Sequence, residues 1–204
     1  AGVILALFEK NQLGKTDLTV RAAERIRTLR PTDPRAEKLH AAFATELASE
    51  KQAFQQKLVR FTAVANAKGG DAAAGKPVFA AMCLACHAVA GEGAGFAPPL
   101  DGSAHRDTEG LLTAILNPDA AVEGNYALYR LSKSYGTVVE GLLAQRDDRG
   151  ATMRFMGGAS LFIPADQISS EGFIAGRSVM PQGLVDGFSD AQMADLLAYI
   201  RSLQ

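Results

Sequence analysis

The most informative stretch of this 204-residue sequence is Cys83-Leu-Ala-Cys86-His87, which contains the only two cysteines of the chain. Two cysteines separated by two residues and followed directly by histidine form the attachment signature of haem c. Thiols three positions apart on a helix-like turn can each add to a vinyl group on one edge of a porphyrin, while the next imidazole binds the iron. The sequence therefore predicts one haem c, covalently held through Cys83 and Cys86, with His87 as an iron ligand.

The same cysteines have three other interpretations: a redox-active dithiol pair, half of a zinc site, or two inert buried thiols. A zinc site needs further ligands, and the remaining histidines, His40 and His105, stand in unrelated parts of the sequence. A dithiol redox motif normally lies beside a βαβ pattern, which this sequence lacks. The haem interpretation is therefore preferred.

A methionine is expected as the second iron ligand. Met180 is followed by Pro181 in a glycine-flanked loop just before the closing predicted helix, from which a thioether can point back at a haem face. The other methionines fit less well, because Met82 adjoins Cys83 and the rest fall in a predicted strand or on the apolar side of a helix. His105 is the second choice.

The loop at residues 91–102, rich in glycine and proline, follows the cysteine motif closely. Glycine lets a backbone pass near a porphyrin edge. A proline carbonyl in this loop can accept the Nδ1 proton of His87, which fixes the tautomer that presents Nε2 to iron.

The remaining sequence predicts two parts, an N-terminal helical segment at 1–68 and a haem domain at 69–204. In the first part, Gly14 and Pro31 end two helices, and Asp33 starts one long helix or two collinear ones. In the second, helices are expected over 71–82, before Asn117-Pro118, and after a capping box that starts at Ser189. Alternating apolar residues over about 126–165 predict a small antiparallel sheet.

The composition is that of an ordinary soluble globular protein, with 48% hydrophobic and 21% charged residues and a net charge of -1. A net charge so close to zero gives no sign of a nucleic-acid-binding surface, which is normally strongly basic. The apolar run over residues 1–8 is too short to span a bilayer. The chain begins at Ala1 rather than Met, which leaves open the removal of a signal peptide or an upstream domain.

These motifs resemble the class I cytochrome c family. Gly75, Phe79 and Tyr199 resemble the family's crossing pair of terminal helices, and the loop Ala97-Pro98-Pro99-Leu100 resembles its Gly-Pro-Asn-Leu type, with Ala97 replacing glycine. The resemblance implies that Pro98 supplies the carbonyl to His87 and that Leu100 packs on the haem ring. It also implies a mainly α fold, in which a cytochrome c-like helical haem domain has a small antiparallel β insertion between the axial ligands and follows the N-terminal helical segment.

Residues from about 71 to 203 further resemble a haem-binding domain common in planctomycete and verrucomicrobial proteins, where a methionine-proline pair precedes the closing helix. Such domains often end long secreted proteins, so the resemblance implies an exported, periplasmic chain that is part of a longer multidomain protein.

The function expected is single-electron transfer by one haem with His87 and Met180 as iron ligands, in exchange with redox partner proteins and without enzymatic activity. Two alternatives stay open. One is a haem-based gas or redox sensor, and the other is the electron-accepting module of a larger dehydrogenase. The iron ligands stand 93 residues apart (180 − 87), which leaves room for the insertion.

Overall fold

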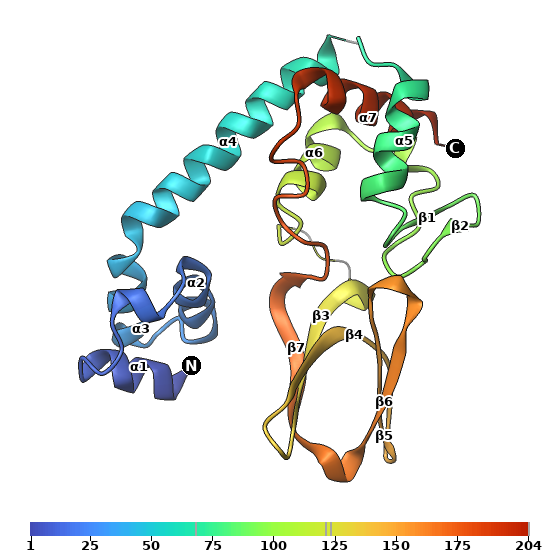
Figure 1. The fold of residues 1–204 in the computed structure, drawn as a ribbon. Coiled ribbons are helices and arrows are strands. Elements are labelled where there is room, and N and C mark those ends of the chain that lie inside the picture. Colours follow the sequence, from blue (N-terminus) through green and yellow to red (C-terminus); the bar gives the residue numbers. More distant parts are fainter. Residues whose placement is uncertain (68, 121, 123, 204) are drawn as a thin grey trace. The chain divides into compact units, whose positions relative to one another are not determined.

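The beginning of the chain is helical, as the spacing of its apolar residues predicts. The helices are α1 (Gly2–Glu9), η1 (Lys15–Asp17), α2 (Val20–Leu29), α3 (Pro34–Ala42) and α4 (Ala44–Asn66) (Figure 1). Side-chain caps at Thr19 and Asp33 fix the starts of α2 and α3, because each accepts a hydrogen bond from an otherwise unpaired backbone N–H. The buried core of these helices consists of Leu5, Ala23, Ile26, Ala36, Leu39 and Phe43.

The computed structural model describes residues 1–67, 69–120, 122 and 124–203. Its contacts divide the chain into two units, Ala1–Gln56 and Lys57–Gln204, so that the division falls inside α4. The boundary predicted between residues 68 and 69 involves Lys68, which lies outside the described residues, and it stays a prediction. Among the described residues, none of the helices is long and apolar enough to cross a membrane.

The helices α5 (Ala72–Met82) and α7 (Asp190–Ser202) pack against each other in the second unit, with α6 (Thr108–Leu116) and η2 (Ser103–His105) nearby (Figure 1). A Cβ atom at Gly75 would lie only 1.9 Å from the carbonyl oxygen of Asp195, so only glycine permits this approach. The rings of Phe79 and Tyr199 stand 5.1 Å apart between the same helices. The expected packing of these two helices is confirmed, as is the capping box at Ser189.

Two antiparallel sheets complete this unit. The short strands β1 (Ala88–Val89) and β2 (Glu92–Gly93) form one. The other contains β3 (Ala127–Lys133), β4 (Val138–Asp147), β5 (Gly150–Arg154), β6 (Ser160–Pro164) and β7 (Ile168–Ser178), in the order β6-β5-β4-β3-β7. Short 3-10 helices precede or join these strands: η3 (Gly124–Tyr126), η4 (Met156–Gly158) and η5 (Ala165–Gln167).

The large sheet has a core of its own, made of Tyr129, Leu131, Ala151, Met153 and Ile163. The expectation of a mainly α fold with only a small β insertion is therefore wrong, because strands make up a five-stranded layer beside the helices. In the large sheet, the strand missed by the sequence pattern is β7, the longest of the five, and the short strands β1 and β2 were also not predicted. The sequence of β7 alternates poorly and includes Gly172 and Gly176, and it is defined by pairing with the distant β3.

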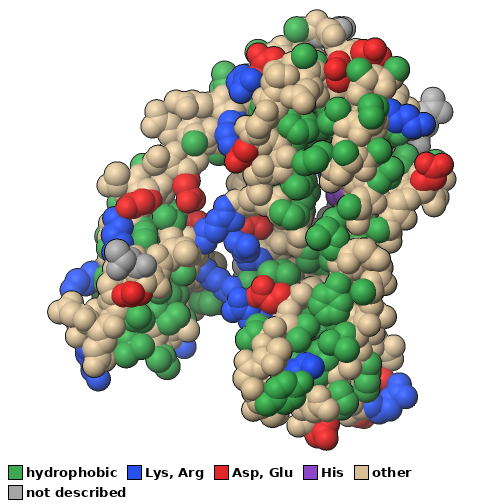
Figure 2. Space-filling view, in the orientation of Figure 1, with side chains coloured by type: hydrophobic (Ala, Val, Ile, Leu, Met, Phe, Trp, Pro, Cys, Tyr) green, Lys and Arg blue, Asp and Glu red, His purple; other side chains and the backbone are tan. Residues whose placement is uncertain are grey.

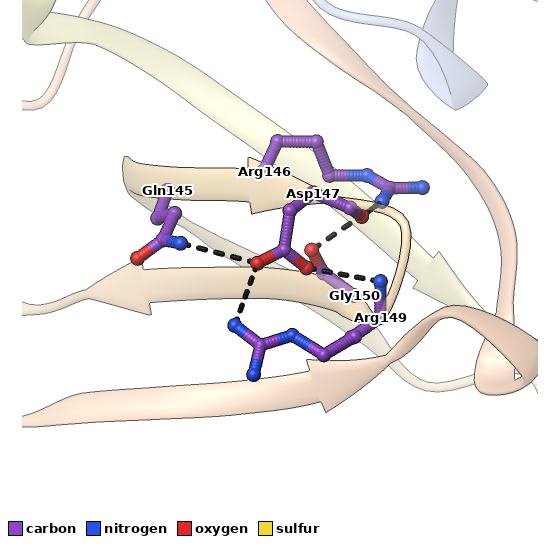
Figure 3. Close-up of polar contacts among 5 residues, drawn as sticks. All are labelled: Gln145, Arg146, Asp147, Arg149 and Gly150. Carbon is purple, nitrogen blue, oxygen red and sulfur yellow. Dashed lines mark hydrogen bonds and ion pairs between the residues drawn. The ribbon is translucent and has the colours of Figure 1, made fainter.

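The turn between β4 and β5 is closed by its own polar side chains (Figure 3). The carboxylate of Asp147 accepts hydrogen bonds from the backbone N–H and the guanidinium of Arg149, both at 2.9 Å, and from Gln145 at 3.1 Å. The two bonds from Arg149 lower the pKa of Asp147, and the bond from the Arg149 side chain is the largest cause. Hydrophobic side chains are also exposed on the second unit (Figure 2). The exposed ones of the large sheet include Val138, Leu161, Phe162 and Phe173.

Candidate functional site

The cysteine motif forms a single helix-like turn at the end of α5. Cys83 is the C-cap of this helix, and its N–H donates to the carbonyl of Phe79 at 2.8 Å. The carbonyl of Cys83 then accepts from the N–H groups of Cys86, at 3.0 Å, and of His87, at 2.8 Å. Both cysteines are free, half-buried thiols. The turn therefore places two thiols and an imidazole in adjacent positions on one piece of backbone.

The ring of His87 is held by the loop that follows. Its Nδ1 lies 2.7 Å from the carbonyl oxygen of Pro98. A carbonyl oxygen can only accept, so Nδ1 carries the proton, and Nε2 keeps its lone pair for a metal. Two backbone bonds fix the loop in place, from the N–H of Ala97 to Cys86 at 2.7 Å and from Leu100 to Ala88 at 2.9 Å.

The β1–β2 hairpin brings the backbone against the motif. Gly93 has a φ of 107°, and a Cβ atom there would lie 2.2 Å from the carbonyl oxygen of His87. The next residue, Ala94, donates its N–H to the carbonyl of Leu84 at 3.1 Å. Glycine at this position therefore allows the loop to close over the cysteine turn.

Burial controls the charge of these groups. It raises the pKa of Cys83 to about 11, with a smaller effect of the neighbouring Cys86, and it also raises the pKa of Cys86. A redox-active dithiol instead has a lowered thiol pKa. Burial lowers the pKa of His87, which favours the neutral imidazole that binds metals, although the bond to Pro98 acts in the opposite direction.

The donor set fits haem c. Two unlinked thiols and an imidazole with a free Nε2 occupy one turn, and the helix before it and the loop after it carry the buried side chains of Phe79 and Phe96. Within the described residues, groups of three or more Cys, His, Asp or Glu side chains that could hold a metal ion are absent, so the ligand set of a structural zinc site is not found there.

Comparison with known families supports the same conclusion. Residues 72–204, which include the whole cysteine motif, match the cytochrome c family. The chain belongs to the cytochrome c family. Its function is accordingly haem-based electron transfer with redox partners, and its cofactor is haem c with iron. A comparison with curated proteins found no match.

The segment that carries Met180 leaves the end of β7 and leads to α7. Met180 is half-buried, and its N–H donates to Oγ of Ser178 at 3.1 Å. The carboxylate of Asp119 accepts from the N–H of Ser178 at 2.8 Å and from Nε2 of Gln182 at 3.0 Å. Sequence reasoning missed Asp119, although an acidic residue directly after the helix stop Asn117-Pro118 was a possible signal.

The predicted site residues thus fall into two groups of contacts. Cys83, Cys86 and His87 share one turn, and Pro98 contacts His87 directly. Leu100 is half-buried and is held through its backbone. Met180 belongs to the group around Asp119. His105, the second choice for the iron, lies in η2 with an exposed side chain.

The loop at residues 91–102 is also hydrogen-bonded to the large sheet. Arg154, the last residue of β5, donates from Nη2 to the carbonyl of Gly95 at 2.7 Å. Gly95 lies three residues before Pro98, whose carbonyl contacts His87. The sheet therefore contributes to holding the loop that orients this histidine.

Proposed function

We propose that this cytochrome carries single electrons on one haem c, attached through Cys83 and Cys86, with His87 and Met180 as the axial ligands. The observation that carries the proposal is the 2.7 Å contact between Nδ1 of His87 and the carbonyl of Pro98. It leaves Nε2 available beside two free thiols. When bound, the haem supplies a one-electron couple between ferric and ferrous iron.

The protein's own residues have separate tasks in this proposal. The two thiols hold the porphyrin edge, and Pro98 keeps the imidazole of His87 in one tautomer and one orientation. Buried Phe96 and Ala97 keep water away from the loop at residues 91–102, and Leu100 would pack on the haem ring. None of these tasks requires a catalytic side chain, so the proposal assigns the chain no enzymatic reaction of its own.

Met180 has the task of setting the reduction potential. A thioether stabilises ferrous iron relative to a second imidazole, so methionine ligation raises the potential. The proposal therefore favours an electron carrier with a comparatively high potential over a sensor, in which the sixth position opens to a gas molecule.

We further assign the chain to the class I cytochromes c and to the domain type of planctomycete and verrucomicrobial proteins. The same proposal places it outside the cytoplasm. The support for these assignments is the Met180-Pro181 pair before α7 and the cysteine motif, which resemble those of exported proteins. Fractionation of the native host, with the haem protein recovered in the periplasm, is the expected result for the location.

Absorption spectra test the ligand set. The ferric protein should show a sulfur-to-iron charge-transfer band that is lost in Met180→Ala, together with a lower reduction potential. Met156→Ala removes a methionine that is 59% exposed and should change neither property. The mass of the denatured protein should still include the haem, because the thioether links survive unfolding.

Three results would contradict the proposal. A wild-type protein without the sulfur-to-iron band has another sixth ligand. Rapid carbon monoxide binding to the reduced wild-type protein would favour the sensor. A denatured protein that loses its haem is not linked through Cys83 and Cys86.

A further inference from the structure

Asp119 joins the two sides of the segment that carries Met180. Its Oδ1 accepts from the backbone N–H of Ser178 at 2.8 Å, and its Oδ2 accepts from Nε2 of Gln182 at 3.0 Å. The guanidinium of Arg177 lies 3.4 Å from the same Oδ2. Three residues that surround Met180 in the sequence therefore bind a single carboxylate.

The backbone around Asp119 is held by buried residues and by a turn. Asp119 follows α6, whose residues Leu111 and Leu112 are buried, and it directly follows the buried Pro118. The N–H of Ala120 closes a turn on the carbonyl of Asn117 at 2.9 Å. The side chain of Asp119 is only 17% exposed, so water competes weakly for its hydrogen bonds.

A second bond transmits this anchoring to the methionine. Ser178 donates its N–H to Asp119, and its Oγ accepts from the N–H of Met180 at 3.1 Å. Asp119 thus fixes the backbone of Ser178, and Ser178 fixes the backbone of Met180. Ordering a free segment so that one side chain stays at one position costs conformational entropy. The hydrogen bonds of Asp119 and Ser178 already order the segment around Met180, so they lower this cost.

We propose that Asp119 is the positioning residue that holds Met180 in place as an iron ligand. The inference rests on the proposed His87 and Met180 ligation. Without Asp119, the segment becomes mobile and Met180 leaves the iron more often, although the haem stays attached through the cysteines.

The test is carbon monoxide binding to the reduced, haem-loaded full chain, measured by stopped flow together with the ferric sulfur-to-iron band. Hydrogen bonds to a charged group are strong enough that Asp119→Ala should bind carbon monoxide about tenfold faster than wild type. Its ferric band should weaken. Asp119→Asn keeps an oxygen acceptor for Ser178 and should change both properties less.

Asp107→Ala is the matched control. Asp107 caps the other end of α6, where its Oδ1 accepts from the N–H of Gly110 at 2.7 Å. The variant should lower the unfolding temperature and leave the band and the carbon monoxide rate unchanged. An equal rise in that rate would show that any weakening of α6 suffices, and would overturn the inference.

The two proposals fail in different ways. If the band is present in wild type and lost in Met180→Ala but unchanged in Asp119→Ala, only the role of Asp119 is wrong. If wild type lacks the band, the ligation by Met180 is wrong and the inference falls with it. Should Asp119→Ala fail to fold, Gln182→Ala replaces it, with a smaller rise in rate expected and an unchanged rate counting against the role.

Discussion

His87 takes its orientation from a backbone atom, the carbonyl oxygen of Pro98, rather than from a neighbouring side chain. Substitution of Pro98 leaves that oxygen in the chain, so the contact depends on the path of the loop. This path is fixed by the backbone bonds of Ala97 and Leu100 and by the bond from Arg154 to Gly95. The residue-level chemistry therefore depends on residues far along the sequence.

Asp33 gives a prediction at the residue scale in the helical unit. The side-chain bond from Arg35 is the largest cause that lowers the pKa of Asp33 to about 2. A carboxylate with a lowered pKa stabilises the fold above its ordinary pKa of 3.8, and this stability is lost as the pH falls toward 2. Asp33→Asn should therefore unfold at a lower temperature than wild type at pH 6. This difference in unfolding temperature should disappear as the pH approaches 2.

Circular dichroism at a series of pH values measures this difference. Asparagine also caps helices well, so the variant removes the ion pair and keeps the cap. Arg35→Gln should lower the unfolding temperature as Asp33→Asn does. The double variant should unfold at nearly the same temperature as either single variant. A difference in unfolding temperature that is constant across the pH range would contradict the prediction.

At the scale of elements, the contact between α5 and α7 depends on the missing side chain of Gly75. An added Cβ would meet the backbone of Asp195, which cannot move without displacing α7. Gly75→Ala should lower the free energy of unfolding by about 2 to 3 kcal/mol, as for other overpacked sites. Chemical denaturation of the haem-loaded protein measures the loss.

Gly172→Ala is the control for this prediction. Gly172 lies in β7, and a Cβ there meets nothing within 4 Å. The control should stay close to wild type. Equal stability of both variants would mean that α5 and α7 can separate at little cost.

The elements also show what the sequence could predict. The cysteine motif, the caps at Asp33 and Ser189 and the helix stop at Asn117 are local signals, and each was visible in a few neighbouring residues. The pairing of β7 with β3 and the contacts of Asp119 and Arg154 join residues tens of positions apart. Such contacts depend on the folded topology, so the partners of these residues could not be identified from a single sequence.

At the scale of the whole molecule, the division into two units falls within α4. The part of α4 in the second unit buries Phe61, which is 2% exposed. It also pairs Lys57 with Asp186 at 2.7 Å and Arg60 with Asp190 at 2.6 Å. The family match begins only at residue 72, so the α4 residues of these contacts lie outside the matched region, whereas Asp186 and Asp190 lie inside it.

Two fragments test the importance of this helical end. The fragment 57–204 should fold, keep the haem spectrum and unfold in one step. The fragment 69–204 lacks Phe61 and should be less stable by about 2 kcal/mol, the value of burying one phenylalanine side chain. The exposed ion pairs should add little to this difference.

Denaturant unfolding of the two haem-loaded fragments gives the comparison. Phe61→Ala in the longer fragment should reproduce most of the loss. Fragments of equal stability would show that the end of α4 is not part of the fold of the second unit.

The pairing of α5 with α7 has a consequence for the order of events during synthesis. Met82 ends α5, and α7 begins only at Asp190, so α5 leaves the ribosome long before its partner exists. Closing so long a loop is slow, because its entropy is lost before the contact forms. Throughout this delay the thiols of Cys83 and Cys86 lack the burial that raises their pKa in the folded protein. The chain is therefore more open to haem attachment, and to unwanted oxidation, before α7 has packed against α5 than after it.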